Sequence, residues 1–378
     1  MIIDQDHAVL ADGDVVFFKF HVEESESDGV GEYYRATVLA DHGLPIDVPI
    51  ATSNDPGEQM VVYAVRESRR MSDVCLDLER DQGPNARLTP ELRSARERLD
   101  DEIGRVLVAT VRTPGDPNRP AAGLHQLFTH RMVDPSSGFP GGRYRGWYIE
   151  NHDWPWLGEA RWTLHGVTYD RTLADLAESA FERLKPDRFA TEPVVVGHGD
   201  DHHGNVWVVE GNGPTELRLF DPAFAGDDLP ALLALVKPTF HNVFAHPFWL
   251  YHPELVEPGT VDVRIDESRR SISVTVDDRP QGGLSALREQ VLTSIVDRAW
   301  IPLLAELRRQ GLLDPHWREV VRSALFLCPF LVTDLLAAHR TPQVRMLGLA
   351  NAVMMGSEPV TGDDPVTRMF DRIEGALG

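Results

Sequence analysis

The sequence of 378 residues predicts an α+β fold in which strands dominate up to residue 68 and helices follow. Residues 7–11 and 15–20 are short apolar runs on either side of an Asp-Gly-Asp turn, a pattern typical of a β-hairpin. Long segments after residue 89 repeat apolar residues at helical spacing. Between them, residues 194–221 alternate short apolar runs with a polar loop and a Gly-Asn-Gly turn, which indicates strands around a functional loop.

The N-terminal part, residues 1–68, is expected to form a small and mostly β lobe. Residues 31–45 have a helical pattern that ends at a proline. Residues 59–64 are mostly apolar and predict a strand that leads into a hinge. The chain is therefore expected to divide after this hinge, with residues 69–378 forming a larger and mainly helical lobe.

Helices are expected through most of the C-terminal part. Thr89-Pro90-Glu91 is typical of a helix start because proline fits the first turn, and the helical pattern runs to about Val111. Residues 261–265 and 272–276 alternate apolar and polar side chains around a charged turn, which predicts a β-hairpin insertion at about 260–277. Further helices are expected at 171–185, 284–309, 316–339 and 342–356, with a short one after residue 364.

The composition is typical of a cytoplasmic enzyme. The chain is 42% hydrophobic but has no apolar run approaching about eighteen residues, so neither a membrane span nor a membrane partner is expected. Cys75 and Cys328 lie far apart in apolar surroundings, which favours buried thiols in a reducing compartment. A formal net charge of −22 argues against a nucleic-acid partner. The same charge favours a cationic small molecule or, equally, solubility in a salty cytoplasm, and both interpretations stay open.

The polar loop after the apolar run 194–196 carries the residues with the clearest chemistry. Asp200 precedes Asn205 by five positions, and Asp221 follows at the end of the next expected hairpin. Phosphoryl transfer needs one carboxylate near the attacking hydroxyl, and an amide oxygen and a second carboxylate on Mg²⁺. These three residues supply that set.

The loop HGDDHHGN, residues 198–205, resembles the HGDxHxGN loop of the aminoglycoside phosphotransferase and choline kinase family, which has a protein-kinase-like fold of two lobes. The resemblance is specific over residues 194–221 and elsewhere rests on a compatible order of elements. It implies that Asp200 orients or deprotonates the acceptor hydroxyl, that Asn205 binds the metal, and that Asp221 bridges the metal to the nucleotide phosphates.

The implied reaction transfers the γ-phosphoryl group of ATP, or of GTP, to a hydroxyl of a small molecule. An aminoglycoside, an amino alcohol and a sugar are all compatible acceptors, and the sequence does not choose among them. Mg²⁺ is the implied cofactor. No oligomeric state is predicted.

Lys19 is the expected contact to the nucleotide phosphates. Only three of the 37 lysine and arginine residues are lysines, so a lysine kept in an apolar strand indicates a place that arginine cannot fill. Glu32, in the helical segment that follows, is its expected ion-pair partner, although other glutamates lie nearby. Backbone groups from Ala64 to Arg66, in the hinge, are expected to hold the adenine.

Two alternative functions stay open. In the resembled fold a first strand and a phosphate-covering loop precede the lysine hairpin, whereas only six residues precede His7 here. The N-terminal lobe is therefore expected to lack this strand and loop. That departure favours a catalytically inactive binding protein of the pseudokinase type as the main alternative. The third interpretation is a metal-dependent hydrolase in which the histidines of the loop are ligands.

Three further segments have open roles. The segment 125–162 holds four of the eight tryptophans. Its aromatic residues either form walls for the acceptor or anchor the segment to the domain, and they include Trp147, Tyr148, Trp154 and Trp156. The polar and aromatic residues at 241–251 either face the acceptor or belong to the core. Asp227 or Asp228 is expected to brace the polar loop.

Overall fold

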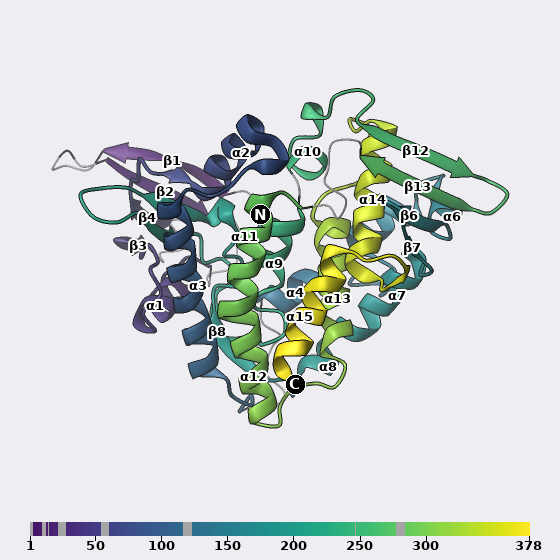
Figure 1. The fold of residues 1–378 in the computed structure, drawn as a ribbon. Helices are drawn as coiled ribbons and strands as arrows, with labels where there is room; N and C mark the ends of the chain where they lie inside the picture. Colours follow the sequence, from purple (N-terminus) through teal and green to yellow (C-terminus); the bar gives the residue numbers. More distant parts are fainter. Residues whose placement is uncertain are drawn as a thin grey trace.

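The computed structural model describes residues 3–9, 13, 15–21, 28–53, 60–115, 123–245, 247–276 and 284–378 of the chain. These residues form a mixed α+β fold, as the sequence predicts (Figure 1). One sheet lies near the N-terminus, helices fill the centre, and a second large sheet lies at the opposite end of the molecule. Among the described residues, no helix is both long enough and apolar enough to cross a bilayer.

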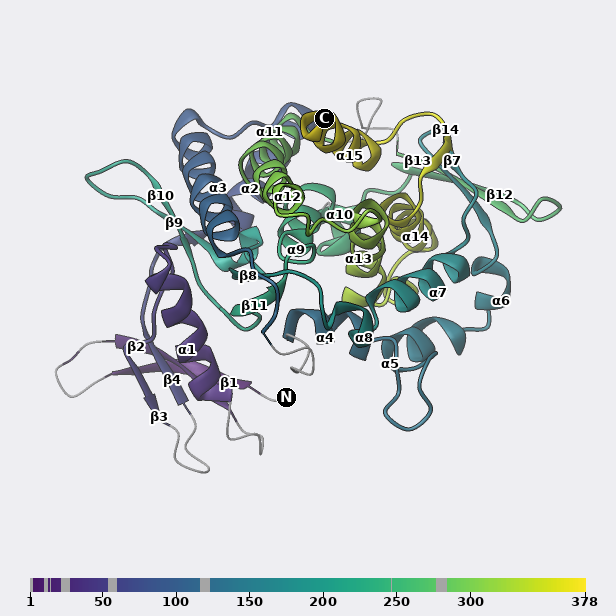
Figure 2. The ribbon, with the colours of Figure 1, turned by 90° about the horizontal axis from the view of Figure 1, so that it is seen from below.

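The N-terminal sheet has four antiparallel strands in the order β1-β2-β4-β3. Strands β1 (Ile3–Val9) and β2 (Val15–His21) form the predicted hairpin, and β1 begins four residues earlier than expected. Strand β4 (Met60–Ala64) is the predicted strand before the hinge, and β3 (Ala51–Ser53) pairs with its other edge. Helix α1 (Asp28–Asp41) lies beside this sheet (Figure 2) and also contacts the strand at 194–197, which leads into the polar loop, and the strand at 226–230.

Two small sheets lie between the N-terminal sheet and the helices. Strand β8 (Val194–Gly197) pairs with β11 (Gly226–Pro230), and all four residues of β8 are buried. The second sheet has the order β10-β9-β5, and its strands are β5 (Arg69–Arg70), β9 (Val206–Val209) and β10 (Glu216–Leu219). The polar loop therefore connects two separate sheets.

Residues 45–47 hold the N-terminal sheet against the second small sheet. The backbone of this segment forms hydrogen bonds to the amide and to the carbonyl group of Leu219. The Leu219 amide donates to Pro45 O at 2.7 Å, and the Asp47 amide donates to Leu219 O at 2.9 Å. The Asp47 carboxylate also accepts hydrogen bonds from Arg66, in the hinge, and from Arg218, in β10. One carboxylate thus links the hinge to the strand that leads to Asp221.

Helix α3 (Pro90–Thr110) begins and ends close to where the sequence predicts. Thr89 caps it by accepting a hydrogen bond from the Leu92 amide. Its last residue, Thr110, accepts a hydrogen bond from the Val196 amide at 3.0 Å and so fixes the free edge of β8. A Cβ atom at Gly104 would lie 1.9 Å from Arg298 O, so only glycine allows this helix to pack against the turn at 296–300.

The predicted helix at 284–309 is interrupted. It consists of α11 (Ala286–Ile295), a wide turn at Val296–Trp300 with π-type hydrogen bonds, and α12 (Ile301–Arg309). Pro302 lacks an amide hydrogen and cannot continue the regular helical bonding to the preceding turn, which accounts for the wider turn before it.

The prediction that a helix extends from 316 to 339 is wrong at its end. Helix α13 (Trp317–Val332) stops because Thr333 has an extended backbone, with φ −137° and ψ 152°. The Asp334 carboxylate then accepts a hydrogen bond from the Leu336 amide and starts a separate turn. Helix α14 (Pro342–Gly356) follows as predicted, and α7 (Leu173–Leu184) packs beside α13 and α14.

The predicted hairpin is confirmed as β12 (Val261–Asp266) and β13 (Ser271–Val276), and it joins a sheet that the sequence did not predict. This sheet has the order β12-β13-β6-β7-β14 and lies at the end of the molecule opposite β1 to β4 (Figure 1). Its other strands are β6 (Arg161–Leu164), β7 (Val167–Tyr169) and β14 (Pro359–Thr361).

The aromatic segment before β6 is anchored to α13. The Tyr148 ring is fully buried and stacks on the Phe330 ring with 4.0 Å between centroids, and its hydroxyl donates to Phe330 O. Trp154 is also buried and contacts the same aromatic cluster. The interpretation that Tyr148 and Trp154 form walls for an acceptor is therefore wrong, because neither side chain is accessible.

The remaining helices are short, apart from α2 and α15. They are α2 (Met71–Gln82), α4 (Gly123–His130), α5 (Gly142–Tyr144), α6 (Trp154–Leu157), α8 (Pro186–Phe189), α9 (Val236–Thr239), α10 (Pro247–Leu250) and α15 (Pro365–Leu377). Helix α15 is the predicted short C-terminal helix.

We predict that Asp47→Ala lowers the free energy of unfolding by about 1–2 kcal/mol, because it leaves the guanidinium groups of Arg66 and Arg218 without their shared carboxylate. Urea denaturation measures this change. Asp77→Ala is the control, since the Arg69–Asp77 pair is more than half exposed and its loss should have no measurable effect. Equal stability of the two variants would contradict the role given to Asp47.

Candidate functional site

The polar loop is held rigidly at the end of β8. Gly199 has φ +74°, and a Cβ atom there would lie 2.9 Å from Leu229 Cδ2, so the turn out of the strand requires glycine. The His198 ring accepts a hydrogen bond from the Asp200 amide at Nδ1 and donates one from Nε2 to Phe220 O at 3.0 Å. The loop is therefore fixed both to its own strand and to the segment before Asp221.

Asp200 lies at the centre of the site and is buried. Its Oδ1 lies 2.6 Å from Lys237 Nζ, which forms an ion pair rather than an aligned hydrogen bond. The His202 Nε2 atom lies 3.5 Å from the same oxygen. Asn205 donates from Nδ2 to Asp200 O at 2.9 Å and closes the loop on itself. Two of the three predicted site residues of this stretch are thus in direct contact.

Asp221 is brought to the loop by the residue before it. The Phe220 amide donates to Asn205 O at 3.1 Å, while Phe220 O accepts from His198. Asp221 itself has φ +58°, a left-handed conformation that few residues other than glycine adopt. The two hydrogen bonds of Phe220 thus fix Asp221 next to the polar loop, and the chain turns there.

Lys19 reaches Asp221 from the N-terminal sheet. Its Nζ atom donates to Asp221 Oδ1 at 2.8 Å, across 202 positions of the sequence. Arg35, in α1, donates to Ala223 O at 3.0 Å and adds a second contact to the same segment. Glu32 lies in α1, but its side chain is outside the described residues, so its pairing with Lys19 stays a prediction.

Ala64 and Arg66 lie at the end of β4 and shortly after it, and their contact with a nucleotide stays a prediction. Ala64 is the last residue of β4 and is exposed. The Arg66 guanidinium is bound by Asp47, so a nucleotide contact there would come from the backbone.

Oxygen atoms at the site suit Mg²⁺, which prefers carboxylate and amide oxygens. Because Asn205 commits its Nδ2 to Asp200 O, its Oδ1 points away from that bond and has no partner in the described part of the chain. Asp221 binds Lys19 through Oδ1, and its side chain is 39% exposed. These two side chains fit the metal-binding role that the sequence predicts.

The loop histidines diverge rather than converge. His198 binds Phe220 O, His202 accepts at Nδ1 from the Gly204 amide, and His203 contacts Cys75 Sγ. Within the ranges that the structure describes, no three His, Cys, Asp or Glu side chains gather in a way that could hold a metal. The hydrolase interpretation therefore has no ligand cluster to support it there.

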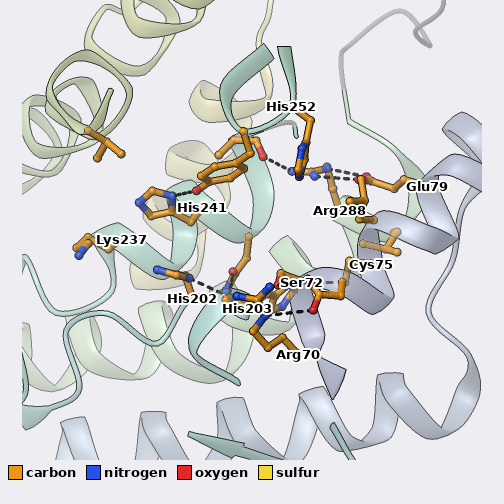
Figure 3. A pocket seen from close by; sticks show the side chains of 18 of the residues that line it. Arg70, Ser72, Cys75, Glu79, His202, His203, Lys237, His241, His252 and Arg288 are labelled. Atoms are coloured by element: carbon orange, nitrogen blue, oxygen red, sulfur yellow. Dashed lines mark hydrogen bonds and ion pairs between the residues drawn. The ribbon is translucent and has the colours of Figure 1, made fainter. Parts of the chain in front are cut away.

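A cavity of about 420 Å³ lies beside the loop (Figure 3). His202 and Lys237, which contact Asp200, form one side of it, and Glu79 and Arg288 form another. His241, Asn242 and Tyr251 also line it, whereas Trp249 is buried in the core. A contact of this segment with an acceptor stays a prediction. His246 lies outside the described residues.

Asp227, one of the two aspartates expected to brace the polar loop, pairs with Arg112 at 3.6 Å.

Lys237 is the main residue that the sequence interpretation missed. It is one of the chain's three lysines and is only 6% exposed, and the argument that singled out Lys19 applies to it equally. Lys185 shows the weakness of that argument, because it lies on the surface and pairs with Glu182. The signal was therefore present, but the composition alone could not separate a buried lysine from an exposed one.

Asp201, the second aspartate of the loop, is buried, and its raised pKa makes the stability of the protein depend on pH. Its side chain is 3% exposed, its Oδ2 has no hydrogen-bond partner among the described residues, and burial raises its pKa. A carboxyl with a raised pKa in the folded protein contributes stability that is fully present below its unfolded pKa of about 3.9 and is lost as the pH rises through the folded pKa.

We therefore predict that Asp201→Asn gains stability relative to the wild type as the pH rises from about 4 to about 7, because asparagine has no charge to bury. Urea denaturation at several pH values measures this difference. Asp371→Asn, at an exposed position, is the control. A stability difference between Asp201→Asn and the wild type that stays constant with pH would contradict the raised pKa.

Comparisons with known proteins leave the family to be argued from the site. No family model matches the sequence, and no curated protein matches it. The structure is similar to a macrolide 2′-phosphotransferase from Brachybacterium faecium, with 12% identity, 93% of this chain and 88% of that chain covered, and a TM-score of 0.36.

It is also similar to an ethanolamine kinase from Plasmodium vivax, with 8% identity, 93% and 80% coverage and a TM-score of 0.38. A microcompartment-associated aminopropanol kinase matches with 9% identity, 99% and 95% coverage and a TM-score of 0.40. By their names, these proteins are phosphotransferases and kinases.

Proposed function

We propose that this protein is a small-molecule kinase of the aminoglycoside phosphotransferase and choline kinase type, which transfers the γ-phosphoryl group of ATP or GTP to a hydroxyl. The observation that carries the proposal is the 2.8 Å ion pair between Lys19 and Asp221. It joins a lysine from the N-terminal sheet to the carboxylate that follows the polar loop, and a nucleotide phosphate chain with its metal needs this pair of charges in one place.

The proposed nucleotide site lies between the N-terminal sheet and the polar loop. Residues 1–68 form the nucleotide-binding lobe in this proposal, and residues 69–378 carry the loop and the acceptor site. Lys19 binds the phosphates, Glu32 supports Lys19, and backbone groups from Ala64 to Arg66 hold the base. The link through Asp47 keeps the hinge and β10 at a fixed separation, which supports a preformed site.

Asn205 and Asp221 would hold Mg²⁺ through Asn205 Oδ1 and the Asp221 carboxylate. When bound, the metal neutralises charge on the phosphate oxygens that react. Lys19, which binds Asp221 Oδ1 in this structure, would offset the remaining charge of that carboxylate.

Asp200 is the proposed group that orients the acceptor. The acceptor oxygen attacks the γ-phosphorus, the bond from that phosphorus to the bridging oxygen breaks, the nucleoside diphosphate leaves, and the hydroxyl proton passes to the Asp200 carboxylate. Lys237 fixes the direction of this carboxylate and offsets its charge, so that the anionic γ-phosphoryl group meets less repulsion.

We predict that Asp200→Asn lowers the rate of ADP release with acceptor by about a hundredfold or more, because an amide cannot accept the hydroxyl proton. Nucleotide affinity should stay within about threefold, since Asp200 does not contact the proposed phosphate site. A coupled assay for ADP and calorimetric titration with ATP measure the two quantities.

Asp363→Asn, which removes the charge of an exposed carboxylate on the far surface, is the matched control and should keep wild-type turnover. Wild-type turnover in Asp200→Asn would refute the role of Asp200. Nucleotide binding without turnover in the wild-type protein, with every acceptor tried, would favour the inactive binding protein instead.

A further inference from the structure

The charges in the cavity beside the polar loop indicate which acceptors fit it, on the basis of the function proposed above. The cavity measures about 420 Å³, within the range of roughly 300–1,000 Å³ that small-molecule sites occupy. Lys237 and His202 line it, and both lie against Asp200 Oδ1. A molecule in this space is therefore one side chain away from the proposed catalytic carboxylate.

The carboxylates that line the cavity are already neutralised. Asp73 accepts two hydrogen bonds from Arg70, at 3.1 and 3.3 Å. Glu79 is buried and binds Arg288 through both oxygens, at 2.6 and 2.9 Å. Among the described residues that line the cavity, no carboxylate is left to pair with a cationic acceptor.

Arg131, in contrast to these carboxylates, is a charged residue of the cavity without a partner of opposite charge among the described residues. It lines the cavity from the turn after α4, and within the described part of the chain its side chain has neither an ion pair nor a hydrogen bond. Burial lowers its pKa to about 10, so its guanidinium stays charged at neutral pH. A partly buried charge without a partner is costly, and a bound anion would offset that cost.

Two histidine rings of the cavity, those of His202 and His241, are shifted toward their neutral form. Burial lowers the pKa of His202 below its usual range and that of His241 far below it. The His241 ring is hydrogen bonded to the Tyr251 hydroxyl. These rings can contact hydroxyl groups of an acceptor without adding a charge. Lys237 is paired with Asp200, so among the described residues Arg131 determines the sign of the cavity.

We propose that the acceptor carries a carboxylate or phosphate group that pairs with Arg131, while its reacting hydroxyl lies at Asp200. Arginine presents a planar pair of donors that matches either anion. An anionic acceptor is the opposite of what the net charge of −22 favours, because that charge by itself attracts cationic molecules. The local charge of the cavity decides here, because screening weakens the field of distant surface charges.

The test uses four pyranose probes that share a ring and differ in charge: glucuronate, glucose 6-phosphate, glucose and glucosamine. Binding is measured by calorimetry without nucleotide, and ADP release is measured with MgATP. The calorimetric part does not depend on catalysis. Failure to bind or consume ATP would thus refute the proposed kinase function, whereas the charge preference of the cavity is measured separately.

We expect an anionic probe to bind about tenfold more tightly than glucose and glucosamine, and Arg131→Gln to remove that preference. Arg131→Lys should restore it in part, because charge returns without the planar pair of donors. Arg145→Gln is the matched control: Arg145 is partly buried, lies outside the cavity lining and should leave binding unchanged. Thermal unfolding confirms that each variant is folded.

Three results would overturn the inference. The first is that glucosamine binds as tightly as the anionic probes. The second is that anion binding survives in the folded Arg131→Gln protein. The third is that neither anionic probe binds at millimolar concentration. If glucuronate and glucose 6-phosphate differ from each other, the difference shows whether the carboxylate or the phosphate is the preferred group.

Discussion

The ion pair between Lys19 and Asp221 is the interaction on which the proposed site depends. It forms only if two separate conditions are met. The N-terminal sheet must lie against β10, which the segment 45–47 achieves through Leu219 and the shared Asp47 carboxylate. Asp221 must also face that sheet, which follows from the two hydrogen bonds of Phe220 to the polar loop. Distant parts of the chain thus meet at one pair of charges.

The buried charged groups around the cavity are of two kinds, those paired with an opposite charge and one that is not. Asp200 and Lys237 neutralise each other in the interior, as do Glu79 and Arg288, so neither pair leaves a net charge for a ligand. Arg131 lacks such a partner among the described residues and leaves the cavity positive, within a chain of strongly negative net charge. In the proposed function, nucleotide binding would therefore rest on Lys19 with Asp221, and acceptor choice would rest on Arg131.

Local sequence signals predicted local structure well. Thr89 and Pro90 marked the start of α3, the turn at Gly13 marked the first hairpin, and the loop octet marked the end of β8. The sequence did not predict the five-stranded sheet, because β6 pairs in parallel with β13 across more than a hundred residues, and neither strand's own pattern encodes its partner. Lys237 was missed for the same reason, since its contact with Asp200 is a tertiary one.

Calorimetric titration of the protein with ATP, with and without Mg²⁺ and in parallel with Asp221→Ala, tests the central claim most directly. We predict binding that requires Mg²⁺ and that the variant loses, because Asp221 joins the metal to Lys19 in the proposed site. Metal-dependent binding that survives in the folded Asp221→Ala protein would contradict this role of Asp221. The absence of any nucleotide binding to the folded wild-type protein would contradict the kinase function itself.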